Sequence, residues 1–585
     1  MLLKRLKEYA ERLDLPPTLY SDATVRYVIE LDRSGRPTNR EPTDTSDPTN
    51  PATRRGLRRA VPQVQRSSGV KPLLLADNAE YTLGLAREKS KPERVADCHT
   101  AYLELLRRCD SATHEPEVSA VLQFLESDPV SRLRLPDDFD LGATISFRVN
   151  GAFPIDLPSV QAFWAAANDP DVDPDRPATV MQCLVCGRER PVLERLQGKI
   201  KGVPGGQTAG TSIISANAPA FESYGLSASL IAPTCPECGE KFTKAANALL
   251  ADKSSRIVLG GTAFLFWTRE KVEFSFREYL TDPKPEQVRA LVDSVRSGKT
   301  MEEVDETAFY ATSLSGSGGR AVVRDWIDTT IGEVRRHLSE WFQRQAVVNS
   351  LGENPQPLGL YSLAVCTVRE AGDLTPPVPR SLLRAALAGT PLPMDLLYQA
   401  VRRNRAEQSI TRPRAALIKL VLLSRNNHTK EDYMVQLDLD NSSPAYRCGR
   451  LLAELEEIQR LAIPGVKATI VDRFFGTASS APSSVFGRLL RGAQPHLAKL
   501  ERDRPGAYRA LQSRLEEIQA GITGFPRVLT LEDQGLFTLG YYHQRAWDRK
   551  QAREAAERRR AGQLSLESDA VINDEDLPAE SSANA

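Results

Sequence analysis

Apolar residues in the first part of the chain follow two different periods. They recur at helical spacing from Leu2 to Leu13 and stop at Pro16, which predicts an opening amphipathic helix. They alternate with polar residues over Val25–Leu31 and again over Ile145–Val149, which predicts two strands. The second strand runs into Asn150–Gly151, a pair that tolerates positive φ and favours a two-residue hairpin turn. The N-terminal region is therefore expected to mix helices and strands.

The second half of the chain has a different pattern. From Glu286 onward, apolar residues recur mostly at helical spacing, interrupted by a Gly- and Ser-rich stretch at 313–319 that we expect to be a flexible loop. Leucine-rich amphipathic segments over 434–560 predict a helical bundle. All charged residues in 561–585 are acidic, and Ser and Ala are common among the others. We therefore expect a disordered acidic tail at 561–585.

These patterns together predict an α+β fold. A mixed α/β N-terminal region at 1–285 carries a four-cysteine insertion at 180–240, and a mostly helical middle region spans 286–433. The bundle at 434–560 and the tail at 561–585 complete the predicted division. With 585 residues, the chain is long enough for about three or four compact units.

Charge and composition exclude several classes of protein. The 76 basic and 76 acidic residues cancel, so any binding of nucleic acid must use local basic patches. The start of the chain has no apolar core of a secretory signal, and no uncharged apolar run approaches the roughly 18 residues that span a bilayer. We therefore expect a cytoplasmic protein with no membrane partner.

Two Cys-x-x-Cys-Gly motifs carry the strongest chemical signal. Cys183 and Cys186 form the first motif, and Cys235 and Cys238 form the second. Four thiolates at this spacing fit one tetrahedral Zn²⁺, and each following glycine permits the tight turn that aims backbone N–H groups at the sulfurs. A site filled by four thiolates has no open position for water, so its expected role is structural. The alternatives are buried cysteine pairs without metal, or a redox pair.

A glycine-rich segment lies between the two cysteine motifs. It begins with Lys199 and Lys201 and continues through Gln207 to Gly210. Such a loop can bring backbone N–H groups close to phosphates, but it lacks the Lys-Ser/Thr pair of a nucleotide-binding phosphate loop. A surface loop without a ligand is the alternative.

Basic residues also cluster outside this loop. Arg54, Arg55, Arg58 and Arg59 belong to a run that has no acidic residue between Asp47 and Asp77, and further excesses occur at 402–419 and 488–514. Contacts between such patches and phosphates would allow a neutral protein to bind nucleic acid through one face. A solvated helix face explains any one patch equally well.

Residue patterns of catalysis are missing from the sequence. The six histidines form no HxH or HxxxH pair, and no GxSxG nucleophile motif occurs. We therefore expect a binding protein that is not an enzyme.

Several segments, in order, resemble the Csd-type large subunit of the type I-C CRISPR-Cas Cascade, a guide-RNA surveillance complex. The resemblance covers most of the chain, and its segments are the opening helix, 71–84, 199–225, 315–326, 412–423 and 444–451. It implies a non-catalytic subunit in antiviral defence that recognises the protospacer-adjacent motif in duplex DNA, promotes duplex opening and R-loop formation, and holds the displaced strand. The implied partners are the guide RNA (crRNA), target duplex DNA, the backbone and crRNA-processing subunits, a small subunit, and a separate helicase-nuclease that the complex helps recruit.

Within this resemblance, chemistry and position select the candidate contacts. Lys71, Asn78 and Gln207 carry groups that can pair with base edges, whereas Arg320 and Arg324, beside the Gly/Ser stretch, suit phosphate contacts. In this family the C-terminal helical region can also be made as a separate small subunit from an internal start, and Met434 is placed to provide one.

Two other functions stay open at this stage. A stand-alone zinc-ribbon protein that binds nucleic acid would bind DNA tightly without partners. A metal-dependent nuclease with scattered carboxylates would cleave DNA with Mg²⁺.

Overall fold

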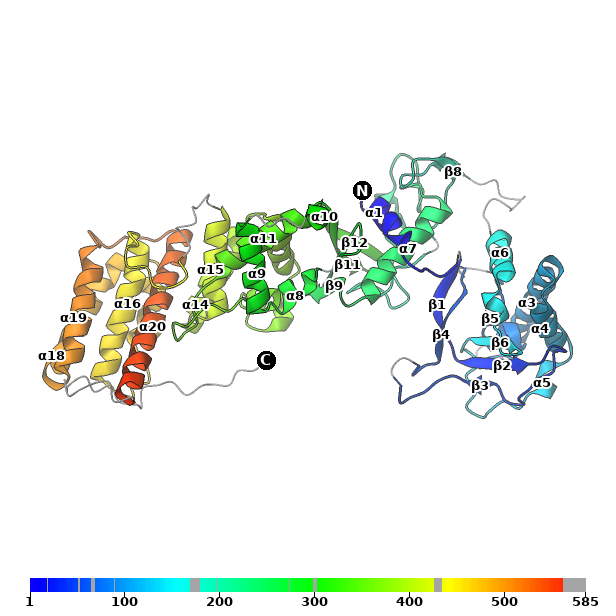
Figure 1. Cartoon of the computed structure of the whole chain (residues 1–585), viewed down its shortest axis with the longest axis horizontal. Helices are drawn as coiled ribbons and strands as arrows, with labels where there is room; N and C mark the ends of the chain where they lie inside the picture. Colours follow the sequence, from blue (N-terminus) through cyan, green and yellow to red (C-terminus); the bar gives the residue numbers. More distant parts are fainter. Residues whose placement is uncertain are drawn as a thin grey trace. The chain divides into compact units, whose positions relative to one another are not determined.

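The computed structural model divides the chain into two compact units. The first comprises Met1–Ala251 with Gly316–Val322, and the second comprises Asp252–Ser315 with Val323–Ala585 (Figure 1). The residues that the structure describes are 1–17, 19–50, 53–64, 69–88, 90–168, 179–196, 198–272, 274–297, 302–425 and 434–560. The predicted boundaries at 285 and 433 stay predictions, and the predicted acidic tail at 561–585 lies outside the described residues.

A four-stranded mixed sheet forms the core of the first unit. Its strand order is β3-β2-β6-β5, and β2 pairs with β6 in parallel from Tyr27 opposite Ile145 to Leu31 opposite Val149. Buried residues such as Phe124 and Phe147 join the helices to this sheet. The elements of this part are β2 (Tyr27–Leu31), β3 (Thr43–Asp44), β5 (Ala76–Asp77), α2 (Ala79–Thr82), α3 (Pro92–Thr113), α4 (Pro116–Glu126), α5 (Pro129–Arg132), β6 (Ile145–Val149) and α6 (Pro158–Ala167).

The predicted strand at 25–31 is two strands, because the chain changes sheets at Arg26. β1 (Tyr20–Val25) pairs antiparallel with β4 (Leu57–Pro62) in a separate ribbon, and β2 enters the mixed sheet. The predicted turn at Asn150–Gly151 is confirmed: both residues have positive φ, and the Val149 N–H donates to the Ala152 carbonyl. The predicted opening helix is α1 (Leu2–Ala10), which packs on α7 (Pro236–Ala251).

The second unit begins with an antiparallel sheet of order β12-β11-β10-β9. Its strands are β9 (Arg256–Leu259), β10 (Thr262–Thr268), β11 (Ala308–Ser317) and β12 (Arg320–Thr330). The expectation of a flexible loop at 313–319 is wrong, because most of this stretch is the end of β11 and the turn into β12. Ser313 and Leu314 are buried opposite β10, and Gly318 supplies the positive φ that the turn requires.

Helices complete the middle of the second unit. Their shared core buries Leu338, Leu382 and Leu417, and it also buries Lys419, whose Nζ donates to the Ala346 carbonyl. Burial lowers the pKa of Lys419 to about 7. The helices are α8 (Phe276–Thr281), α9 (Pro285–Arg296), α10 (Glu302–Asp305), α11 (Ile331–Gln345), α12 (Leu360–Val365), α13 (Pro377–Ala388), α14 (Met394–Glu407) and α15 (Arg412–Arg425).

The predicted C-terminal bundle is confirmed. It consists of α16 (Pro444–Ala462), α17 (Ile470–Ala478), α18 (Phe486–Asp503), α19 (Pro505–Ala520) and α20 (Leu531–Arg560) (Figure 1). Two glycines allow α16 and α20 to approach closely: a Cβ at Gly449 would lie 2.0 Å from the Phe537 carbonyl oxygen, and one at Gly540 would lie 2.1 Å from that of Tyr446. Among the helices of the described ranges, none has the length and apolar character to cross a bilayer.

Candidate metal centre and candidate nucleic-acid interface

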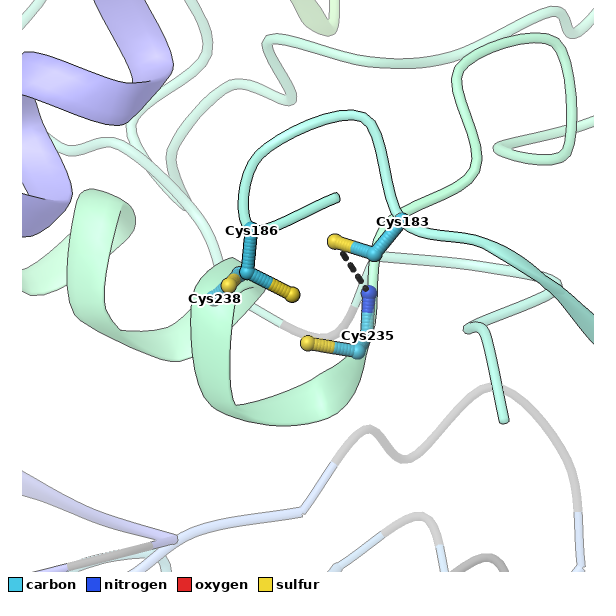
Figure 2. Close-up of side chains that lie close together, drawn as sticks. All are labelled: Cys183, Cys186, Cys235 and Cys238. Carbon is cyan, nitrogen blue, oxygen red and sulfur yellow. Dashed lines mark hydrogen bonds between the residues drawn. The ribbon is translucent and has the colours of Figure 1, made fainter. Parts of the chain in front are cut away.

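The four cysteines of the two motifs converge on one point of the first unit. Cys183 and Cys186 lie on the turn between β7 (Val180–Gln182) and β8 (Glu189–Pro191), and Cys235 and Cys238 lie at the start of α7. Their Sγ atoms lie within 4.8 Å of one another (Figure 2). Sulfurs bound 2.3 Å from a tetrahedral Zn²⁺ stand about 3.8 Å apart, so the four thiols fit a single metal ion.

Hydrogen bonds favour the thiolate form of Cys183 in this cluster. The Cys235 N–H donates to Cys183 Sγ over 3.4 Å, and an Arg190 guanidinium N–H lies 3.7 Å from Cys235 Sγ. Burial opposes ionisation of Cys183, but the N–H groups of its neighbours outweigh burial and lower its pKa to about 7. Burial instead raises the pKa of Cys238 above its ordinary value. A bound cation would offset the cost of the remaining thiolate charges.

Backbone geometry holds the two motifs against each other. Gly187 adopts a φ of +74° and donates to the Cys183 carbonyl, which closes the first turn. The Leu184 N–H donates to the Pro233 carbonyl, and the Arg190 guanidinium pairs with Glu237 at 3.0 Å. The cysteine cluster therefore fixes both ends of the segment that contains the glycine-rich loop.

The glycine-rich loop is ordered by the tip of the β11–β12 hairpin, which belongs to the same unit. Gly316 donates to the Pro204 carbonyl over 2.7 Å, and Ser212 exchanges backbone hydrogen bonds of 2.9 Å with Gly319 and Ala321. The contact is so close that a Cβ on Gly316 would lie 2.1 Å from the backbone nitrogen of Gly206. These two glycine-rich stretches, distant in sequence, form one surface.

The two lysines of this loop are positioned by α7. Asn247 accepts from the Lys201 N–H at 2.8 Å and donates to the Lys199 carbonyl at 2.9 Å, so its amide holds the backbone of both residues. The Lys199 ammonium donates to Ser212 Oγ at 2.7 Å, whereas the Lys201 side chain is exposed. Gln207 is exposed as well and lies next to Gly319.

A cleft of about 1050 Å³ adjoins this surface within the first unit. Arg58, Lys199 and Lys201 line it, so the structure brings one residue of the arginine run to the two loop lysines. Asp14 and Asp22 also line the cleft, which makes its charge mixed rather than uniformly basic.

The other arginines of the run are placed differently. Arg54 and Arg55 are exposed in the turn before β4. Arg59 lies over the Phe153 ring at 3.7 Å and pairs with Asp156, which neutralises its charge. Arg54, Arg55 and Arg58 are therefore more accessible to a ligand than Arg59.

Lys71 and Asn78 both contact residues of α2. The Lys71 N–H donates to the Tyr81 hydroxyl, and the Asn78 side chain accepts from the Glu80 N–H at 3.1 Å as the N-cap of α2. Because the Asn78 carbonyl oxygen caps a helix, pairing with a base would depend on its amide nitrogen.

Arg320 and Arg324 differ in their surroundings. The Arg320 guanidinium lies 4.0 Å from the Phe221 ring centroid, in the first unit. Arg324 belongs to the second unit, where its Nε donates to Ser315 Oγ at 2.8 Å. The candidate residues therefore do not form one continuous site in either unit.

Sequence reasoning assigned no role to Asn247, Phe221 or Tyr224. Asn247 sits within an amphipathic helix and has no local signature, because its partners lie more than 40 residues away in the sequence. Phe221 and Tyr224 lie in a polar, glycine-containing segment where large rings are unexpected. The presence of two large aromatic residues in a polar segment was the sequence signal that could have identified them.

Fold and site together define an α+β protein of two compact units, with a four-cysteine candidate metal centre at the start of helix α7 and a glycine-rich loop held by the same helix. The family model described as "CRISPR-associated protein (Cas_Csd1)" matches residues 4–548. The chain therefore belongs to the Csd1 family of CRISPR-associated proteins. No curated protein matches the chain.

Proposed function

We propose that this protein is the non-catalytic large subunit of a type I-C guide-RNA surveillance complex. Membership of the Csd1 family over residues 4–548 is the observation that carries the proposal. In this role the subunit recognises the protospacer-adjacent motif in duplex DNA, promotes duplex opening and R-loop formation, and helps recruit a separate helicase-nuclease. Its partners are crRNA, target DNA and the other Cascade subunits, in the cytoplasm.

The surface formed by the glycine-rich loop and the hairpin tip supports the recognition part of this proposal. Exposed Lys201 and Gln207 project from a loop whose backbone is fixed by Asn247 and by the hairpin. A fixed backbone holds the Gln207 side-chain amide in position for contacts with base edges, and the Lys201 ammonium attracts the phosphates. Lys71 and Asn78 form a second candidate contact near α2.

The metal in this proposal is Zn²⁺ with a structural role. Four cysteine ligands fill a tetrahedral site, so the ion would clamp the glycine-rich segment and activate no water. Metal analysis of protein purified without added zinc tests this assignment, with one zinc per chain as the expected content. Replacement of Cys235 by Ser should abolish that content, and Cys366→Ser, at a thiol outside the cluster, is the matched control.

The experiment that tests the function measures duplex-DNA binding by the chain alone and by the chain assembled with crRNA and its sister subunits. Targets differ only in the base pairs that flank the guide match. We expect tight binding that requires the complex and changes with the flanking pairs. Equally tight binding by the lone chain would favour the stand-alone zinc-ribbon function, and Mg²⁺-dependent cleavage by the lone chain would favour the nuclease.

Variants of the loop sharpen this experiment. Gln207→Ala should reduce the preference for the correct flanking pairs by about 5- to 150-fold, because one good base contact discriminates by about 1–3 kcal/mol. Thr208→Ala, at the adjacent exposed position, is the matched control. Lys201→Ala should instead weaken binding to all targets and reduce its salt dependence. An unchanged flanking preference in Gln207→Ala would remove Gln207 from the recognition site.

A further inference from the structure

Tyr224 is displayed on the surface of the first unit in an unusual way. Its side chain is 97% exposed, the highest value among the large hydrophobic residues that the structure describes as exposed. It occupies a two-residue turn in which the Leu226 N–H donates to the Ser223 carbonyl over 2.9 Å. Both central residues have positive φ, +53° at Tyr224 and +72° at Gly225.

This turn is built against the preference of its first central residue. A turn with two positive φ values favours Asn-Gly, Asp-Gly or Gly-Gly, and a bulky side chain is disfavoured in the left-handed region. Tyr224 also gives up the burial that usually stabilises a large ring. Because the ring contributes neither to the turn nor to a core, its display points to a ligand outside the chain.

The surroundings of Tyr224 indicate the chemistry of that ligand. Phe221, three residues away and therefore within about 11 Å along the chain, is 44% exposed and lies under the guanidinium of Arg320. In the loop segment 199–226 and the hairpin tip 316–322, the charged residues are Lys199, Lys201, Glu222 and Arg320. Three cations and one anion favour a ligand that carries phosphates.

We propose that Tyr224 is a stacking platform for an unpaired nucleobase, with Arg320, which contacts the neighbouring Phe221, and the exposed Lys201 of the same loop segment holding phosphates of the strand. Aromatic rings and guanidinium planes both stack on bases, and every base offers such a face regardless of sequence. The excess of cations favours a nucleic-acid strand over a protein partner at this surface. The proposal rests on the proposed nucleic-acid function and assigns Tyr224 as a residue of this surface that contacts a single-stranded segment.

Binding of the full-length chain to single-stranded oligodeoxythymidylate, alone and in the assembled complex, tests the proposal. Tyr224→Asn removes the ring and suits the turn, so the variant should fold, and its affinity should fall by about 5- to 150-fold. Tyr224→Phe keeps the stacking surface and should stay within twofold of the wild type. The salt dependence of binding should be unchanged in Tyr224→Asn and reduced in Lys201→Ala, because stacking releases no counterions.

A strand carrying 5-iodouracil adds a direct readout, with photo-crosslinks expected at position 224. Unchanged single-strand affinity in Tyr224→Asn, together with weaker binding by Lys201→Ala, would overturn the stacking role and leave the proposed function standing. Failure of the wild type to bind nucleic acid in any form would overturn both. Loss of complex assembly in Tyr224→Asn, with strand binding intact, would show that the ring contacts a protein and would also overturn the proposal.

Discussion

Replacing Gly316 by Ala should separate the glycine-rich loop from the hairpin tip. Its Cβ would lie 2.1 Å from the Gly206 nitrogen, 2.3 Å from the Gly205 carbonyl carbon and 2.4 Å from the Gly206 Cα. All three atoms belong to backbone, so no side chain can rotate away. Since carbon contacts are comfortable at about 3.5–4.0 Å, the two backbones must move apart by more than about 1 Å.

The energetic cost of this separation follows from the contacts at the interface. Overpacking of a close contact costs about 1–3 kcal/mol when neighbours shift to relieve it. The shift also weakens the hydrogen bond from Gly316 to the Pro204 carbonyl, which contributes about 0.5–1.5 kcal/mol. The local free energy of opening of the loop should therefore fall by about 1.5–4.5 kcal/mol, which corresponds to a roughly 10- to 2000-fold rise in the open population.

Amide hydrogen exchange measures that population directly. The Ser212 and Ala321 amides, which bridge the loop and the hairpin, should exchange faster in Gly316→Ala by about the factor of the opening equilibrium. Gly319→Ala is the matched control, because its Cβ would meet only the Gln207 side chain, at 3.4 Å. Equal protection in the two variants would refute the argument that backbone contact orders this loop.

Further predictions concern the metal centre and two buried ionisable groups of the bundle. Chelation of the bound metal, or Cys235→Ser, should raise exchange at the Cys235 amide, which donates to Cys183 Sγ, and should lower the melting temperature of the first unit; Cys366→Ser should do neither. Burial lowers the pKa of His543 to about 3, so the unfolded chain binds a proton below about pH 6.5 that the folded chain refuses, and stability attributable to His543 should fall by about 2 kcal/mol from pH 6.5 to 5. Urea unfolding should show this loss as a difference in pH slope between the wild type and His543→Gln. Burial raises the pKa of Asp548 well above its ordinary value, so the folded chain keeps a proton that the unfolded chain loses, and stability from this group falls as the pH rises above about 4. Unfolding of Asp548→Asn between pH 5 and 7 should therefore lack this loss, and an identical slope to the wild type would contradict it.

Local signals made much of the fold predictable from the sequence. The cysteine spacing predicted the cluster because each Cys-x-x-Cys-Gly turn is determined by five consecutive residues. Asn150–Gly151 predicted its turn because the two residues themselves favour positive φ. The stretch 313–319 was misread because its glycines and serines resemble a flexible linker. Its order comes from pairing with β10 and from close contact with Gly205 and Gly206, neither of which is local in sequence. The candidate site was likewise predictable only where its signal is local. The lysines at the start of the loop identified Lys199 and Lys201, but the sequence could not show that the distant Asn247 positions them.

The packing of the bundle bears on its proposed existence as a separate small subunit that starts at Met434. The bundle has a core of its own, which includes Leu451, Phe475 and Phe537. One face of α20 and the start of α16 also pack into the core of the preceding helices, where Tyr446, Leu539 and Tyr542 are buried. A fragment that begins at Met434 would expose these three side chains to water. A free small subunit is therefore expected to associate through this face, because association would return these apolar side chains to a buried environment.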